Sequence, residues 1–90
     1  MNKAELISEV SEKVGITKKE VGNILDATTE VIRETLSKGG KVTLVGFGTF
    51  WVLNRKARRG RNPQTGEEIQ IPAKKRPKFR AGKKLREAVV

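Results

Sequence analysis

Hydrophobic residues recur at helical spacing near the start of the chain. The first stripe, which falls on one side of a helix, consists of Leu6, Ile7, Val10 and Val14. This pattern predicts an amphipathic helix. Asn2, three residues before Glu5, matches a capping box at the helix start, and Gly15 predicts the helix end.

A second, longer stripe follows Thr17, which forms another capping pattern with Glu20. Its apolar or small members are Val21, Ile24, Leu25, Ala27, Thr28, Val31, Ile32, Thr35 and Leu36. Gly39 and Gly40 predict where this helix ends. We interpret both stripes as packing surfaces.

A helix-turn-helix DNA reader is the alternative interpretation, since a glycine-containing turn joins the two helices. The second helix is long for a recognition helix, and Arg33 is the only base between residues 20 and 34. The acids of the same stretch are Glu20, Asp26, Glu30 and Glu34. Because phosphate would repel such a face, we interpret the helices as scaffold.

Alternation of apolar and polar residues replaces helical spacing after residue 40. The stretch "KVTLVGFGTFWVL" predicts two short strands, at 41–45 and 49–54, with a hinge at 46–48. Between Arg55 and the reversal at Asn62-Pro63, the chain has almost no large apolar side chain. Asn62-Pro63 and Gly66 predict a reversal there, with glycine in a left-handed conformation, so we expect a basic hairpin arm.

The aromatic residues of this half lie among apolar neighbours. We expect Phe47, Phe50 and Phe79 to fill the core between sheet and helices, with base stacking as the alternative. Alternation places Trp51 on the strand face opposite Phe50.

The end of the chain predicts a final short strand leading into a last helix near 83–90. Residues 74–86 hold eight bases, interrupted by Pro77 and Phe79. The expected inward side of the last helix consists of Leu85, Ala88 and Val89.

The basic hairpin arm has few apolar side chains of its own to bury. An isolated arm of two strands is marginal in water, so we expect it to need a binding partner.

Charge divides the chain into two different halves. Residues 1–40 hold six Lys and Arg against seven Asp and Glu, whereas residues 41–90 hold fourteen against three. This segregation favours a polyanion as the partner of the second half. The chain has neither cysteine nor histidine, so disulfides and zinc sites of the usual kind are excluded. Because the start of the chain lacks the apolar core of a signal peptide, we expect a soluble, cytoplasmic protein.

The segment "GFGTFWVLNRKARRGRNPQT", residues 46–65, resembles the signature of the bacterial histone-like HU/IHF family of DNA-bending proteins. The similarity extends over the whole chain. Its further marks are "IP" at 71–72, Pro77, Phe79 and Gly82-Lys83.

The resemblance implies an α+β fold that forms an intertwined homodimer. Residues 1–40 would form the helical pair at the dimer base, and residues 41–90 a three-stranded antiparallel sheet, an extended β-ribbon arm at about 55–74 and a short C-terminal helix. The second helix has more apolar positions than one short neighbouring helix would cover, and a second subunit would cover the rest. The arm would then find its contact surface on nucleic acid.

The resemblance also implies sequence-tolerant binding, bending and compaction of double-stranded DNA in the nucleoid. Pro63 would wedge between base pairs from the minor groove, since its stiff ring lacks a backbone donor. The expected DNA-binding residues are Lys3, Gly46, Arg55, Arg58, Arg61, Asn62, Pro63, Lys75, Arg80, Lys83 and Arg86. No metal, cofactor, small-molecule substrate or membrane partner is expected.

Three positions depart from the family pattern. Position 53 is usually basic and is Leu53 here; position 51 is usually polar or acidic and is Trp51; position 81 is usually proline and is Ala81. These departures put the contacts at the arm root in question. Lys56 and Arg59 add charge nearby that offsets the loss at position 53.

Other functions remain as alternatives. Sequence-preferring bending, as in IHF, differs only in its choice of deformable sites. RNA binding is disfavoured because A-form duplex resists a minor-groove wedge, and membrane binding because the bases lie mainly on strands. For an enzyme, the candidate bases are Glu67 and Glu68, which we expect instead to pair with arm arginines or cap the turn.

Overall fold

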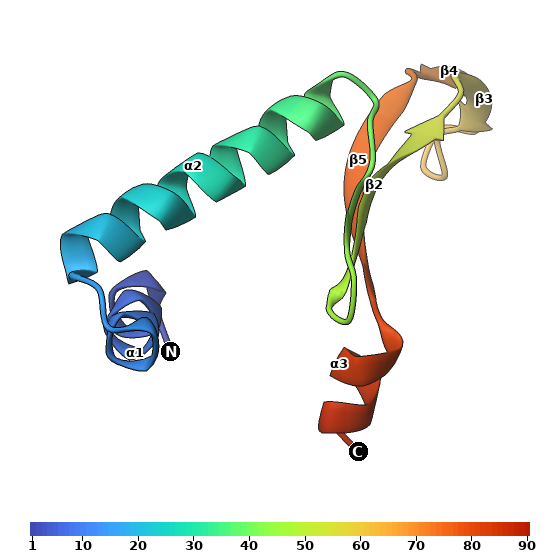
Figure 1. Cartoon of the computed structure of the whole chain (residues 1–90). Helices are drawn as coiled ribbons and strands as arrows, with labels where there is room; N and C mark the ends of the chain where they lie inside the picture. The colour runs from blue at the N-terminus through green and yellow to red at the C-terminus, as the bar shows by residue number, and fades with distance from the viewer. The chain divides into compact units, whose positions relative to one another are not determined.

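The computed structural model describes the backbone of residues 1–90 and every side chain except those of Arg58 and Ile71. Helices come first, and strands follow before a last short helix, so the predicted α+β class is confirmed. The chain forms two compact units, Met1–Glu34 and Thr35–Val90. Each unit is described by itself (Figure 1).

Helix α1, Lys3–Val14, begins and ends where its capping residues predict. The Glu5 backbone N–H donates to Asn2 Oδ1 at 2.9 Å. Gly15 follows the helix with φ 81° and donates its N–H to Ser11 O. A side-chain acceptor thus satisfies one free donor at the first turn, and glycine supplies the left-handed conformation at the last.

Helix α2, Lys18–Ser37, is also defined by local signals. The Glu20 N–H donates to Thr17 Oγ1 at 3.1 Å. At the other end, Gly39 has φ 80°, and the Gly40 N–H donates to Thr35 O at 2.9 Å. Both predicted caps and the predicted glycine stop are therefore confirmed.

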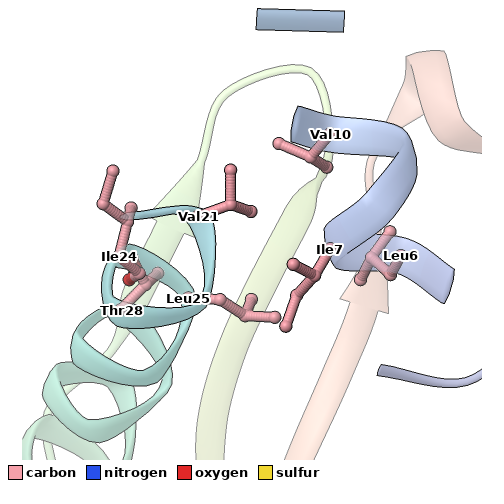
Figure 2. Close-up of a pocket in the computed structure, with 7 residues that line it drawn as sticks. All are labelled: Leu6, Ile7, Val10, Val21, Ile24, Leu25 and Thr28. Carbon is pink, nitrogen blue, oxygen red and sulfur yellow. The ribbon is translucent and has the colours of Figure 1, made fainter. Parts of the chain in front are cut away.

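The two helices present their apolar stripes to each other, as the side chains in Figure 2 show. They border an apolar hollow of about 170 Å³ lined by Leu6, Ile7, Val10, Val21, Ile24, Leu25 and Thr28. Yet Val21, 5% exposed, is the only buried apolar side chain among those described. Ile24 is 58% exposed and Leu6 41%. The apolar faces of one chain are thus left largely uncovered.

The larger sheet is antiparallel and has the strand order β1-β2-β5. Its strands are β1, Val42–Leu44, β2, Gly48–Arg55, and β5, Lys74–Ala81. The three-stranded sheet and both predicted hairpin strands are confirmed. Between β1 and β2, Gly46 takes φ 85° and the Phe47 N–H donates to Leu44 O at 2.9 Å, which makes the expected hinge a tight turn.

Strand β5 corrects the prediction of a short final strand. It has eight residues and pairs antiparallel with β2 along its whole length; Figure 1 shows the two ribbons side by side. Pro77, which interrupts the sequence pattern, lies inside the strand opposite Val52. Because β5 is an edge strand, a residue without a backbone donor is tolerated there.

A separate two-stranded ladder forms the arm. Strand β3, Arg58–Arg61, pairs antiparallel with β4, Glu68–Ile71. Arg55 lies opposite Lys74 in the larger sheet, and Arg58 lies opposite Ile71 in the arm, so the two ladders share one register across a short gap. Pro72 lies in this gap and has no N–H to donate, which accounts for the interruption.

Helix α3, Lys83–Ala88, is shorter than the predicted 83–90 and stands next to the β1–β2 turn. The Gly82 N–H donates to Phe47 O at 2.8 Å. Leu85 is half-buried as expected, whereas Ala88 and Val89 are exposed rather than inward. The helix ends at Ala88, so Val89 lies beyond it and does not extend the side that holds Leu85.

The phenylalanines cluster but are not enclosed. The Phe79 ring lies 4.7 Å from that of Phe50 and 5.5 Å from that of Phe47, measured between centroids. Phe47 is 47% exposed and Phe79 43%. The expected aromatic cluster is present, and in the single chain it is only partly buried.

Among the described residues, no helix combines the length and apolar character needed to cross a membrane.

Candidate nucleic-acid interface

The larger sheet has two chemically different faces. Residues directly opposite each other in an antiparallel pair lie on the same face, and neighbours along a strand lie on opposite faces. Phe50 opposite Phe79 and Val52 opposite Pro77 therefore define an apolar face. The predicted separation of Trp51 from Phe50 is confirmed by this register.

The other face carries a row of bases along β5. Opposite Thr49, Trp51, Leu53 and Arg55 of β2 lie, in order, Arg80, Lys78, Arg76 and Lys74. We call this surface the cationic face. All four β5 side chains are exposed. Like charges so placed repel one another, and a polyanion relieves that repulsion.

An open hollow of about 350 Å³ lies on the cationic face. Its lining residues are Lys41, Thr49, Trp51 and Arg80. The Trp51 ring is 36% exposed there, and Leu53, next on the same face, is half-buried. Among the described lining residues, Trp51 is thus the one apolar side chain, and it lies with two cations and a threonine.

The arm tip is a hydrogen-bonded loop at 62–67. The Asn62 N–H donates to Glu67 O at 2.8 Å, and the Gly66 N–H donates to Asn62 O at 2.7 Å. Asn62 Oδ1 also accepts from the Gln64 N–H at 2.9 Å. Gly66 takes φ 72°, which confirms its predicted left-handed role.

These bonds place the Pro63 ring at the exposed end of the ribbon. Pro63 follows Asn62, which is half-buried, and lies inside the loop that Asn62 closes. Proline needs no partner for a backbone donor, and its fixed φ suits an early turn position. An apolar ring is therefore held at the tip without a buried polar group.

Behind the tip, strand β3 carries the arginines of the arm, and β4 carries Glu68. Arg61 lies opposite Glu68, and Arg59 Nη1 lies 3.8 Å from Glu68 Oε2. The expectation that Glu68 pairs with an arm arginine is confirmed, although both groups are exposed and such a pair stabilises little. Arg58 was also predicted as a contact, and its side chain lies outside the described residues.

A second group of predicted contacts gathers at the β1–β2 turn. A Cβ on Gly46 would lie 3.4 Å from Lys84 Cδ, so the turn and the start of α3 are in contact. Lys83 and Arg86 lie on that helix and are exposed. The structure thus brings Gly46 close to the cations of α3.

Two predicted residues lie elsewhere. Lys75 is opposite Asn54, on the face of the ribbon opposite to that of Arg55. Lys3 Nζ lies 2.5 Å from Asp26 Oδ1, so in the helical unit this cation already has an anionic partner. A phosphate would compete with Asp26 for Lys3.

The cationic face contains residues that the sequence did not single out. Lys41, Lys74, Arg76 and Lys78 share it with Arg55 and Arg80. Their signal was the even numbering of 74, 76, 78 and 80, which period-two alternation places together once the stretch is known to be one strand. The expectation of only a short final strand hid that signal.

Comparison with known proteins agrees with this geometry. The model of the family described as "Bacterial DNA-binding protein" matches residues 1–90. The DNA-binding protein HU of Staphylococcus aureus is 57% identical over 89 residues, which cover 99% of each chain. HU from Anabaena, solved as a cocrystal with DNA, superposes with a TM-score of 0.84 at 54% identity over 99% of this chain and 97% of that one. HU from Thermotoga maritima superposes with a TM-score of 0.71 at 40% identity over 100% of both chains. The chain belongs to the bacterial DNA-binding protein family, with HU proteins among its relatives.

Proposed function

We propose that a homodimer of this chain binds, bends and compacts duplex DNA with little sequence preference. The observation that carries this proposal is the ribbon arm, which projects an exposed Pro63 at its tip from a sheet with a cationic face. The relative from Anabaena, solved with DNA, supports duplex DNA as the partner.

A second copy of the chain accounts for the uncovered apolar surface. Val21 alone is buried among the described apolar side chains, while Ile24, Phe47 and Phe79 are each more than 40% exposed. Short chains with so little buried surface depend on association for stability. We assign residues 1–40 to the dimerisation base and residues 41–90 to the sheet, arm and last helix.

Dimerisation is tested by sedimentation equilibrium of the free protein. The expected mass is twice that of one chain. An Ile24→Glu variant, which puts a charge on the apolar stripe, should shift the mass toward that of the monomer and lower the melting temperature. A monomeric, cooperatively folded wild-type protein would contradict this part of the proposal.

Phosphate contacts are assigned to the predicted cations. Arg55 and Arg80 of the cationic face, Lys83 and Arg86 of α3, and Arg58, Arg61 and Lys75 of the arm and its root would neutralise the backbone, with Gly46 offering a backbone N–H. Lys3 joins them when it leaves Asp26. Such contacts position the duplex but read no sequence.

The tip residues are assigned to bending. Pro63 inserts between base pairs from the minor groove, and its flat ring replaces part of the lost stacking contact. Asn62 and Arg61 follow the groove, where the negative potential is strongest. The hydrogen bonds that close the 62–67 loop pre-organise this wedge, so less entropy is lost on binding.

Salt dependence tests the electrostatic part. With about six to ten phosphate contacts, affinity should fall by roughly 10³ to 10⁵ between 50 and 200 mM salt. Fluorescence anisotropy with a labelled random-sequence duplex measures this slope. A flat response to salt would rule out binding of this kind.

A Pro63→Ala variant tests the wedge. End-to-end FRET on a doubly labelled duplex should report a smaller bend, while the salt slope stays near that of the wild type because no cation is removed. Gln64→Ala, one residue along the same exposed loop, is the control and should bend DNA normally. An unchanged bend in Pro63→Ala would refute the wedge and leave DNA binding itself intact.

We assign no catalytic role to the arm acids, because Glu68 pairs with Arg59 and the Glu67 carbonyl closes the tip loop. Binding to chromosomal DNA would place the protein in the nucleoid. Imaging of a fluorescent fusion should show it on the DNA mass of the cell.

A further inference from the structure

We infer that Trp51 is a DNA-contact residue whose indole ring packs against the deoxyribose of the sugar–phosphate backbone, between phosphates held by Lys41 and Arg80. This inference rests on the proposed function and names a contact within it. It concerns an apolar side chain on a surface otherwise made for an anion.

The position of the ring is the first step. Trp51 is directly opposite Lys78 in the sheet and lines the same hollow as Lys41 and Arg80. It points away from the cluster formed by Phe50 and Phe79, because successive strand residues face opposite sides. The ring therefore adds nothing to that cluster and is 36% exposed on the cationic face.

The chemistry of the hollow identifies its occupant. Lys41 and Arg80 repel basic ligands and favour an anion, while the exposed Trp51 side chain gains from a partner that removes it from water. The backbone of a duplex offers both, since apolar sugars alternate along it with charged phosphates. A free phosphate would pair with Lys41 and Arg80 but would leave the Trp51 ring exposed to water.

The expected consequence is a part of the affinity that does not depend on salt. Phosphate contacts release counterions and weaken as salt rises, whereas removal of apolar surface from water does not. A dimer has two such rings. Their loss should weaken binding by about tenfold or more at every salt concentration, because burying about 30 Å² of each of the two rings at about 25 cal/mol per Å² already corresponds to that factor.

The composition of the chain allows a direct test on the unmodified protein. Trp51 is the only tryptophan, and there is no tyrosine, so intrinsic fluorescence reports this ring alone. With saturating random-sequence duplex, acrylamide quenching of Trp51 should fall at least twofold, and the emission should shift to shorter wavelength. Acrylamide is uncharged, so the change cannot come from the field of the DNA.

The matched variants are Trp51→Thr, which keeps a residue suited to strands, and Val89→Thr as the control. Val89 is apolar and 78% exposed but lies at the end of α3, away from the cationic face. Anisotropy of a labelled duplex should show about tenfold weaker binding for Trp51→Thr with an unchanged salt slope. Val89→Thr should bind as the wild type does.

Three results would overturn the inference. Acrylamide quenching that stays unchanged while anisotropy reports full binding would show that the Trp51 ring remains exposed to water in the complex. The proposed function would then stand without the Trp51 contact. Wild-type affinity in Trp51→Thr, or a loss confined to low salt, would show that the ring contributes no apolar contact. No anisotropy change for the wild-type protein would refute the proposed function together with this contact.

Discussion

Neutralising Arg80 isolates one charge of the cationic face. Arg80 lies opposite Thr49 and lines the hollow that also contains Lys41 and Trp51. The side chain is exposed, and no ion pair joins it to an acid among the described residues. Its charge is therefore available to phosphate, and an Arg80→Gln variant removes that charge while retaining a polar, extended side chain.

The size of the effect follows from counterion release. Each phosphate contact contributes about 0.9 to the slope of log affinity against log salt, so two copies of Arg80 in a dimer contribute about 1.8. Across a tenfold decrease in salt this amounts to about 60-fold in affinity. The variant should therefore approach wild-type binding at high salt and fall progressively behind it as salt decreases.

Anisotropy titrations at four or more salt concentrations measure this slope. Lys13→Gln is the charge-matched control, because Lys13 lies in the last turn of α1, in the half of the chain where acids balance bases. Its slope should equal that of the wild type. Equal slopes for Arg80→Gln and wild type would refute the assignment of the cationic face to DNA, while equal decreases in both variants would show that net charge alone matters.

Three further outcomes follow from single contacts. Gly48→Ala should destabilise the protein by about 1–3 kcal/mol in thermal unfolding, because its Cβ would lie 2.5 Å from Phe79 Cζ. Unchanged stability would show that the sheet shifts enough to make room for the Cβ. Asp26→Asn should raise DNA affinity at low salt by freeing Lys3, with less than about 1 kcal/mol change in stability since the pair is exposed; weaker binding would contradict this. Asn2→Ala should cost about 1 kcal/mol in urea unfolding by removing a cap, and no loss would show that the cap is dispensable.

The helices and turns were predictable because their signals are local. Asn2 and Thr17 are three residues from the N–H groups that they accept, and Gly66 sits in the left-handed turn that its neighbours require. A single short stretch contains both the donor and the acceptor, so sequence order alone specifies these elements. The arm and its tip belong to the same class of prediction.

The cationic face was predicted only in part because it depends on pairing between distant segments. Arg80 and Arg55 were expected as separate contacts, but only the β2–β5 register places them on one surface with Lys78 and Arg76. Only a short final strand was expected, so the bases of 74–80 were not placed together on one surface. Strand β5 is longer because an edge strand tolerates Pro77.

The state of Lys3 was beyond sequence analysis for a similar reason. Its partner Asp26 is 23 residues away on another helix, and the spacing of charges along the chain does not indicate that contact. Exposure of the phenylalanines was likewise missed. A sequence shows which residues are apolar, but whether one chain can cover them depends on how much surface it has to spare.

Strand β2 connects the assembly of the protein with its binding surface. Phe50 and Val52 lie half-buried on its apolar face, whereas Trp51 and Leu53 lie among cations on the other. Because side chains alternate with a period of two, a slip of one residue would exchange the two sets. The register with β5 thus separates the apolar face, which we assign to protein packing, from the cationic face, which we propose for DNA. The same register continues into the arm, so the ladder can be interrupted at Pro72 without exchanging the faces of the arginines beyond it.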